Sequence, residues 1–290
     1  MMAVTDTRRV GVLGATSLVG AALLSELKAQ SFAPIAYSRR RAASADDGVQ
    51  WRALPEAGGK PESVFGDQDI AVWVSLAPIW ILPQYFDALR ASGAKRIVAL
   101  SSTSRFTKTS SSVESEQALA RKLIDAEAAL IAWAEAAGVE YVILRPTLIY
   151  GGEHDGNISE IARFIRRFGM FPVFGAARGL RQPVKAADIA AASVAAVTAP
   201  AAANQAYNLS GGETLQYRQM VARVFAAMGK RPRILTVPLG IFKLALAGVR
   251  LVPRYRHWSV GMAERMNEDL VFAHDDAQRD LGYRPSKFEP

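Results

Sequence analysis

The sequence predicts an α/β fold, a Rossmann-like doubly wound parallel sheet with a smaller C-terminal lobe. Strand-like and helix-like stretches alternate through the first half of the chain, which is the pattern of repeated βα units. Right-handed crossovers between such units place helices on both faces of a parallel sheet. After residue 150 the rhythm changes to shorter apolar pieces, which indicates a second lobe that interrupts the sheet.

The elements follow from hydrophobic periodicity and from the glycines and prolines that end them. Strands are predicted at residues 10–13, 34–37, 70–76, 96–100 and 141–144. Helices are predicted at residues 18–27, 83–93 and 118–137, and a serine-rich flexible loop at 107–112. In the second half we expect helices at 158–168, 189–197 (capped by Asp188) and 217–228, and short strands at 171–174, 182–184 and 207–210.

The turn between the first strand and the first helix is typical of a dinucleotide-binding site. Gly14 permits a tight turn, Gly20 permits close packing of the helix on the strand, and Ser17 stands where a third glycine is usual. Backbone N–H groups at such a helix start bind a pyrophosphate. The expected cofactor contacts here are Gly14, Thr16, Ser17, Leu18, Val19 and Gly20. We therefore expect a dinucleotide-binding core over residues 1–150, and over 151–290 the remaining sheet units interleaved with a small substrate-binding lobe.

Composition excludes several classes of protein. Half of the 290 residues are hydrophobic and 21% are charged, which is the composition of a folded protein. The chain has no cysteine, so disulfides, thiolate metal sites and cysteine nucleophiles are excluded. Its three histidines lie far apart in the sequence and show no metal-ligand spacing, which favours surface histidines. The net charge of +8 favours a phosphate-rich ligand, because no nucleic-acid motif accompanies it. The polar N-terminus lacks a signal-peptide core, so a cytoplasmic location is expected.

An apolar segment over residues 234–252 has two interpretations. Pro238, Lys243 and Gly248 interrupt it, so it is no spanning helix of about 20 apolar residues. It is either a helix packed in the small lobe or a helix on a membrane surface, with arginines near residues 250–256 at the head groups. We favour packing.

Six segments in order resemble the extended branch of the short-chain dehydrogenase/reductase superfamily, in particular its atypical, nucleoside-diphosphate-sugar epimerase- or dehydratase-like members. They cover almost the whole chain: GATSLVG (14–20), VALSST (98–103), LRPTLIYG (144–151), PVKAADIA (183–190), NLSGG (208–212) and DLGYRP (280–285). The resemblance implies this fold, an NAD(P) cofactor and a small-molecule substrate between the lobes.

The catalytic pattern of that family is incomplete here. The family uses a Ser or Thr hydroxyl together with Tyr-x-x-x-Lys on a helix, where the ammonium lowers the pKa of the phenol. The resemblance places the lysine at Lys122, but the position four residues earlier is Ala118. Thr103, with Ser102 as second choice, is the expected carbonyl-facing hydroxyl. The missing proton donor would be replaced by water, a substrate group, Lys122 or Tyr150.

The residues after the second strand favour NADP(H) over NAD(H). An acidic residue would bind the ribose 2′-hydroxyl of NAD, whereas this chain has Ser38, Arg39 and Arg40 and no acid before Asp46. Guanidinium forks and a hydroxyl suit a 2′-phosphate. The remaining expected cofactor contacts are Leu76, Ala77, Lys122 and Pro146.

Two functions remain open at this point. The first is an oxidoreductase or epimerase-like enzyme acting on a small polar substrate, possibly a sugar nucleotide, with Tyr150, Asn157 and Arg181 as candidate contacts and Arg178 beside them. The second is a non-catalytic NADPH-binding sensor or assembly subunit, with membrane association through residues 234–258 as a further option. We expect a monomer, or a homodimer paired through the helix at 118–137.

Overall fold

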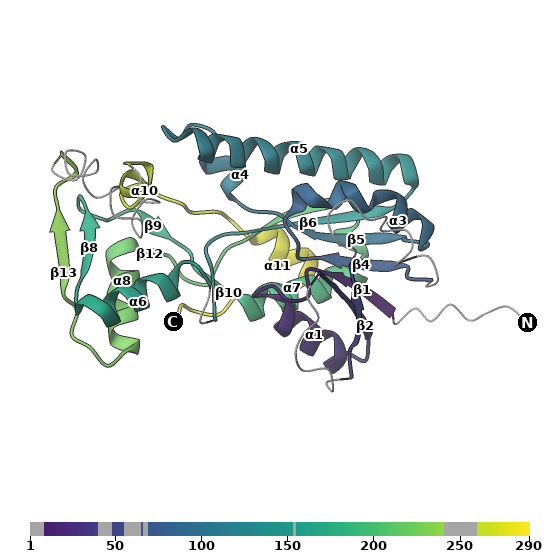
Figure 1. Ribbon diagram of the computed structural model, residues 1–290, viewed down its shortest axis with the longest axis horizontal. Helices are drawn as coiled ribbons and strands as arrows, with labels where there is room; N and C mark the ends of the chain where they lie inside the picture. Colours follow the sequence, from purple (N-terminus) through teal and green to yellow (C-terminus); the bar gives the residue numbers. More distant parts are fainter. Residues whose placement is uncertain (1–8, 40–47, 55–64, 66–68, 153–154, 241–259) are drawn as a thin grey trace, which may run out of the picture.

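A parallel sheet forms the centre of the molecule. The computed structural model describes residues 9–39, 48–54, 65, 69–152, 155–240 and 260–290. In this part of the chain seven parallel strands form one sheet in the order β11-β6-β5-β4-β1-β2-β3 (Figure 1). The strands are β1 (Arg9–Leu13), β2 (Ala33–Ser38), β3 (Gln50–Ala53), β4 (Val72–Ser75), β5 (Arg96–Leu100), β6 (Glu140–Pro146) and β11 (Gln205–Leu209). The predicted α/β, Rossmann-like fold is confirmed.

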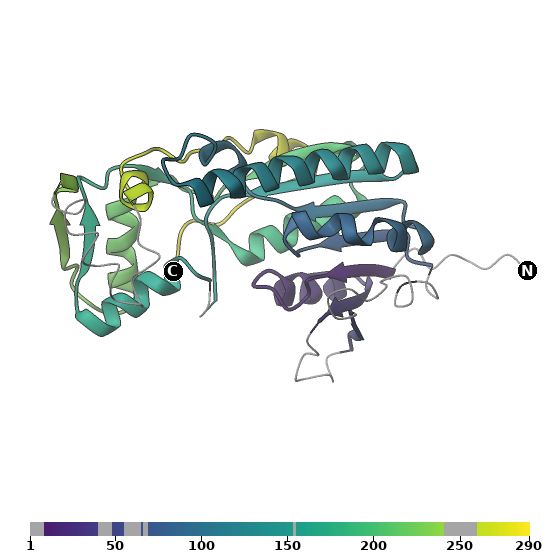
Figure 2. The ribbon, with the colours of Figure 1, turned by 45° about the horizontal axis from the view of Figure 1, so that its top comes forward.

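Helices cover both faces of this sheet, so its inner strands are apolar on both sides (Figure 2). One face carries α1 (Gly20–Ala29), α7 (Ala186–Thr198) and α11 (Asp275–Leu281). The other face carries η1 (Ile79–Tyr85), α3 (Phe86–Ala91) and the long α5 (Glu114–Ala137). The order of the strands reverses between β1 and β4, which is the point where a ligand binds in folds of this type.

A smaller lobe lies beyond the carboxyl ends of the strands, at the left of Figure 1. It contains the helices α6 (Ile158–Phe168), α8 (Tyr217–Ala227) and α10 (Val260–Arg265). Its strands form the pairs β8 (Phe171–Phe174) with β13 (Ile234–Val237) and β9 (Leu180–Arg181) with β12 (Leu215–Gln216). Between the lobes lie the pair β7 (Ile149–Tyr150) with β10 (Val184–Lys185) and the short helix α4 (Ser104–Thr107). The short helix η2 (Pro200–Ala202) precedes β11 of the main sheet.

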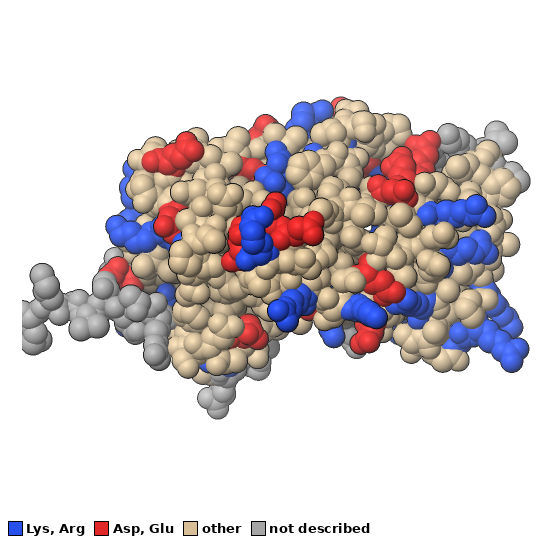
Figure 3. Space-filling model, turned by 180° about the vertical axis from the view of Figure 1, so that it is seen from behind, with Lys and Arg blue, Asp and Glu red and all other residues tan. Residues whose placement is uncertain are grey.

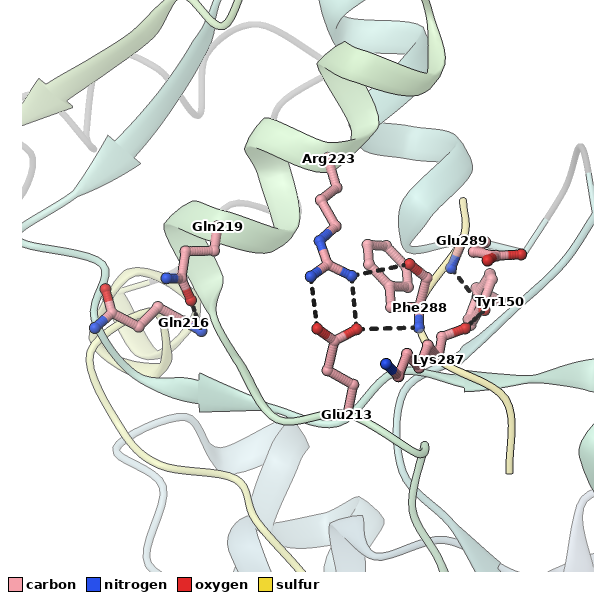
Figure 4. Close-up of polar contacts among 8 residues, drawn as sticks. All are labelled: Tyr150, Glu213, Gln216, Gln219, Arg223, Lys287, Phe288 and Glu289. Atoms are coloured by element: carbon pink, nitrogen blue, oxygen red, sulfur yellow. Dashed lines mark hydrogen bonds and ion pairs between the residues drawn. The ribbon is translucent and has the colours of Figure 1, made fainter. Parts of the chain in front are cut away.

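The C-terminal segment is bound to the small lobe through the Glu213 carboxylate (Figure 4). Glu213 makes two hydrogen bonds with the Arg223 guanidinium, at 2.5 and 2.6 Å, and accepts a third from the Phe288 N–H. Arg223 also donates to the Phe288 carbonyl, and the Phe288 ring packs edge-on against Tyr150 with centroids 5.0 Å apart. These contacts bury Phe288 in the core of the small lobe.

The structure corrects several expectations about the elements. Two further sheet units were expected after residue 150, but of the described residues there only β11 joins the main sheet. The helix expected from residue 118 begins at Glu114, where two glutamates in the first turn suit the helix dipole. Asp188 does not cap α7, because the helix already begins at Ala186. The Asp188 carboxylate instead accepts hydrogen bonds from the N–H and the hydroxyl of Ser286.

The apolar segment at 234–252 begins as strand β13 rather than as a helix. Residues 241–259 lie outside the described residues, so most of this segment carries no structural account. No helix in the described ranges combines the length and the apolar character needed to span a membrane.

Candidate functional site

The turn after β1 has the geometry that the glycine spacing predicts. Gly14 has φ +75°, and a Cβ there would lie 2.6 Å from the backbone nitrogen of Ala77. A Cβ on Gly20 would lie 2.0 Å from the Ala15 carbonyl oxygen. Only glycine fits at either position, because any side chain would push the turn away from β4 or from α1. The turn therefore packs directly on Leu76 and Ala77, at the carboxyl end of the sheet.

Polar atoms around this turn fit an anionic group that the chain itself does not supply. The Ser17 hydroxyl is buried and has no hydrogen-bond partner among the described residues, and the same holds for Ser75 at the end of β4. No acidic residue lies in the first turn of α1, and no side chain of the described structure caps that helix. A buried hydroxyl without a partner and an uncapped helix start are the features that a bound phosphate would satisfy.

The end of β2 lies beside the same turn. The exposed Thr16 places its hydroxyl 3.3 Å from that of Ser38, which is buried. Arg39 is exposed and close to Tyr85: burial raises the pKa of Tyr85, and the charge of Arg39 opposes that rise. Arg40 lies outside the described residues. Ser38 and Arg39 thus lie together at the carboxyl end of β2, beside the glycine turn.

A cavity of about 740 Å³ opens between the carboxyl edge of the sheet and the small lobe. It begins at Leu18 of the glycine turn and passes the segment after β5, where Ser102 and Thr103 lie. It then extends along α6 to β8 and α8 in the small lobe. Its size is that of a site for a small organic ligand.

The two hydroxyls after β5 differ in what they can still donate. Both Ser102 and Thr103 line the cavity. Thr103 is buried, and its hydroxyl donates to the Pro146 carbonyl at 3.1 Å. The Ser102 hydroxyl accepts a hydrogen bond from the Ser104 N–H at 3.1 Å, so its proton remains available to a ligand. The geometry therefore favours Ser102 over Thr103 as a donor, the reverse of the order expected from the sequence.

Lys122 does not face the cavity, which corrects the register expected for α5. Its side chain is exposed and outside the cavity lining. The buried side of this part of the helix carries Ala120, Leu123, Ala126 and Glu127, with Leu119 partly buried beside them. Leu119 and Leu123 have the spacing of a Tyr-x-x-x-Lys pair, but they pack in the core against the sheet and also lie outside the cavity lining. Two leucines have no proton to donate and no charge that would lower a pKa.

Sequence reasoning missed a buried ion-pair network centred on Glu127. Its side chain is 2% exposed, and the Arg145 guanidinium binds it with two nitrogens, at 2.6 and 3.1 Å. Arg105 lies 3.2 Å from it, and the Ser101 hydroxyl donates to it at 2.5 Å. The network joins α5 to α4 and to the ends of β5 and β6. An acidic residue within the apolar stripe of the helix was the signal that could have indicated it.

The three candidate substrate contacts differ in where they lie relative to the cavity. Tyr150 is buried outside this cavity, where its hydroxyl donates to the Lys287 carbonyl and accepts from the Glu289 N–H (Figure 4). Asn157 lines the cavity and is exposed. Arg181 also lines it, but the guanidinium is committed to the carbonyls of residues 180, 265 and 268. Arg178 is exposed and outside the lining.

A family model matches the middle of the chain. The NAD dependent epimerase/dehydratase family matches residues 84–210, which run from η1 through β5, α5 and β6 to the end of β11. The match spans less than half of the chain, and it includes Ser102 and Thr103 of the cavity wall.

Relatives and solved structures of similar fold extend the comparison. The chain is 29% identical over 120 residues to a UDP-glucose 4-epimerase of Vibrio cholerae, which covers 41% of this chain and 37% of that protein. It is 30% identical over 130 residues to an NAD(P)H azoreductase of Xenophilus azovorans, covering 45% of this chain and 43% of the relative. The matches thus span about two fifths of the length of these curated relatives.

The solved structures cover nearly the whole chain. UDP-glucuronic acid 4-epimerase from Bacillus cereus in complex with NAD has a TM-score of 0.72 at 14% identity, covering 96% of this chain and 93% of that one. UDP-glucose 4-epimerase from Thermotoga maritima with UDP-glucose has a TM-score of 0.70 at 15% identity, with the same coverage. At this identity the likeness establishes the fold, including the small lobe, and leaves the substrate open.

Proposed function

We propose that this chain is an NADP(H)-binding protein of the epimerase/dehydratase type, with an oxidoreductase-like site in the cavity between its lobes. The observation that carries the proposal is the contact between Thr16 on the glycine turn and Ser38 at the end of β2, with Arg39 next in sequence. A hydroxyl and a guanidinium suit a 2′-phosphate, whereas NAD would need a carboxylate, and the described residues at the end of β2 include none.

The chain's own residues divide the work of binding between them. Gly14 and Gly20 keep the turn close to the sheet, and the Ser17 hydroxyl and the start of α1 would hold the pyrophosphate. Leu18 links this turn to the cavity, and Ser102 offers the hydroxyl proton nearest to that link. When bound, the nicotinamide would supply or accept a hydride at this end of the cavity.

Helix α5 contains no tyrosine and its Lys122 is exposed, so this helix supplies no proton donor of the Tyr-x-x-x-Lys type. A positioned general acid contributes about 10²–10⁴ in rate, and Leu119 and Leu123 contribute none of it. A reaction here would take its proton from Ser102, water or the substrate. One relative at this level of similarity is named NAD(P)H azoreductase, so its name refers to a reduction and not to an epimerisation.

A second candidate function is that of a non-catalytic NADPH-binding subunit or sensor. The composition of α5 favours it, because that helix has no tyrosine and its Lys122 is exposed. The two candidates differ in turnover and share the cofactor. Transfer of deuterium from 4-deuterated NADPH to a small-molecule acceptor would support the first, and tight NADPH binding without any transfer across an acceptor panel would support the second.

The proposed cofactor preference is tested by fluorescence titration with NADPH and NADH. We expect NADPH to bind more tightly, and Arg39→Gln to weaken NADPH binding about tenfold, because a charged hydrogen bond contributes about 1.5–3 kcal/mol. NADH binding should change little. The control is Arg90→Gln, which removes the same charge from an exposed position on α3. A preference for NADH, or equal effects of the two substitutions, would contradict the proposal.

A further inference from the structure

Aromatic side chains dominate the small-lobe half of the cavity. Phe164 and Phe168 of α6 have ring centroids 4.6 Å apart, and Phe171 of β8 packs edge-on against Phe164 at 5.5 Å. Tyr217 of α8 and Phe272 line the same space from other elements. Faces and edges of rings from several elements surround a flat apolar body well, because aromatic pairs prefer offset and edge-to-face packing.

The polar side chains of this lining are largely committed to the protein itself. The Thr147 hydroxyl donates to the Gln182 carbonyl, and the Gln182 side-chain oxygen accepts from the Phe272 N–H at 2.7 Å. The guanidinium of Arg181 binds three backbone carbonyls. The Asp155 carboxylate accepts from the N–H groups of Asn157 and Ser159. Apart from Ser102 and Asn157, a ligand rich in hydroxyl groups, such as a sugar, would find few partners here and would lose its hydration.

The cavity lining carries positive charge from Lys108, which follows α4, and from Arg167 next to the aromatic rings. In the cavity lining, the acidic Glu160 pairs with Arg163, and the basic Arg265 pairs with Glu116. Arg167 forms no salt bridge or side-chain hydrogen bond with any residue of the described ranges, and its guanidinium lies 5.4 Å from the ring centroid of Phe168. Both Arg167 and Phe168 are exposed. On the face opposite that of Figure 1, Lys and Arg side chains also gather at the small-lobe end (right of Figure 3).

We infer that the cavity takes an aromatic anion rather than a sugar nucleotide. The ring system lies against Phe164, Phe168 and Phe171, and a carboxylate or sulfonate meets Arg167 at the mouth. This arrangement buries the apolar body and keeps the charged group hydrated beside a cation, so neither part loses solvation without compensation. This inference adds a ligand class to the proposed function. It rests on that function only for the role of the other end of the cavity, at Leu18.

The experiment uses two fluorescent probes of nearly the same shape, the anion 8-anilinonaphthalene-1-sulfonate and its neutral analogue N-phenyl-1-naphthylamine. We expect saturable binding of one sulfonate per chain that UDP-glucose does not displace. Arg167→Gln should weaken the sulfonate about fivefold, the effect of an exposed charge pair, and leave the neutral probe unchanged. Phe168→Ala should weaken both probes alike. Arg166→Gln, the same loss of charge one residue away and outside this lining, should change neither.

Displacement of the sulfonate by micromolar UDP-glucose would overturn the inference, as would equal effects of Arg166→Gln and Arg167→Gln. Non-saturable sulfonate binding would also overturn it. NADPH titration of the same variants separates this result from the cofactor proposal. Arg167→Gln should leave the NADPH dissociation constant unchanged, so a failure of the sulfonate result with normal NADPH binding counts against the ligand class alone.

Discussion

Substitution of Glu127 by glutamine tests the buried ion-pair network. The variant keeps the shape of the side chain and removes its charge. Arg145 and Arg105, whose side chains are only 14% and 21% exposed, would then face a neutral amide. One end of that amide is a donor, so it would meet either an arginine N–H or the Ser101 hydroxyl without accepting from it.

The expected loss of stability is about 3 kcal/mol, since breaking one side of a buried ion pair typically costs 3–5 kcal/mol and the amide retains part of the hydrogen bonding. For a chain of this size each kcal/mol lowers the melting temperature by about 2–4 °C, so we expect a decrease of roughly 6–12 °C. The matched control is Glu160→Gln, which removes an exposed i,i+3 pair with Arg163. That change should cost less than about 0.5 kcal/mol.

Urea and thermal unfolding followed by circular dichroism measure both changes. A double-mutant cycle of Glu127→Gln with Arg145→Gln should show a coupling energy of about 1 kcal/mol or more, because the two groups are in direct contact. If Glu127→Gln costs no more than Glu160→Gln, or if the cycle is additive, the network does not stabilise the ends of β5 and β6 as we argue.

Three further predictions concern single groups. Burial raises the pKa of Tyr37 to about 12, and its hydroxyl has no partner among the described residues, so stability should fall as pH rises from about 10 to 12. Tyr37→Phe should reduce that loss in pH-dependent melting, because burial also raises the pKa of other tyrosines such as Tyr217, whereas Tyr141→Phe should leave it. Hydrogen bonds from Arg223 hold the pKa of Glu213 below its usual range, so Glu213→Gln should weaken the decline in melting temperature below about pH 5. A decline as steep as in the parent chain would refute this. Lys122→Ala should leave the NADPH dissociation constant within about twofold, because Lys122 is exposed; a larger change in titration would contradict the observed register.

The elements that could be predicted are those with strong periodicity or marked ends. The strand at 96–100 and the helix at 158–168 agree with β5 and α6 residue for residue. The strand β3 was not predicted, because Gln50–Ala53 is an edge strand without a continuous apolar run. The helix α11 was missed because only two of its seven residues, Ala277 and Leu281, are buried.

The candidate site likewise has one part that could be predicted from the sequence and another that could not. The glycine turn could be predicted because its residues are contiguous and because steric limits on Gly14 and Gly20 act locally. The register of α5 could not, since a shift of one residue exchanges Lys122 for Leu123 and only packing against the sheet decides which faces inward. The Glu127 network likewise joins residues up to 26 positions apart.

By itself, the sequence determined that this chain forms a parallel α/β sheet with a glycine turn at the start of its first helix. Periodicity and glycine spacing act over a few residues, so local chemistry is enough to specify them. Only the tertiary structure decided that Lys122 faces solvent, that Tyr150 is buried beside Phe288, and that the small lobe offers aromatic walls beside Arg167. Those outcomes depend on which surfaces meet after folding, and no single stretch of the chain contains that information.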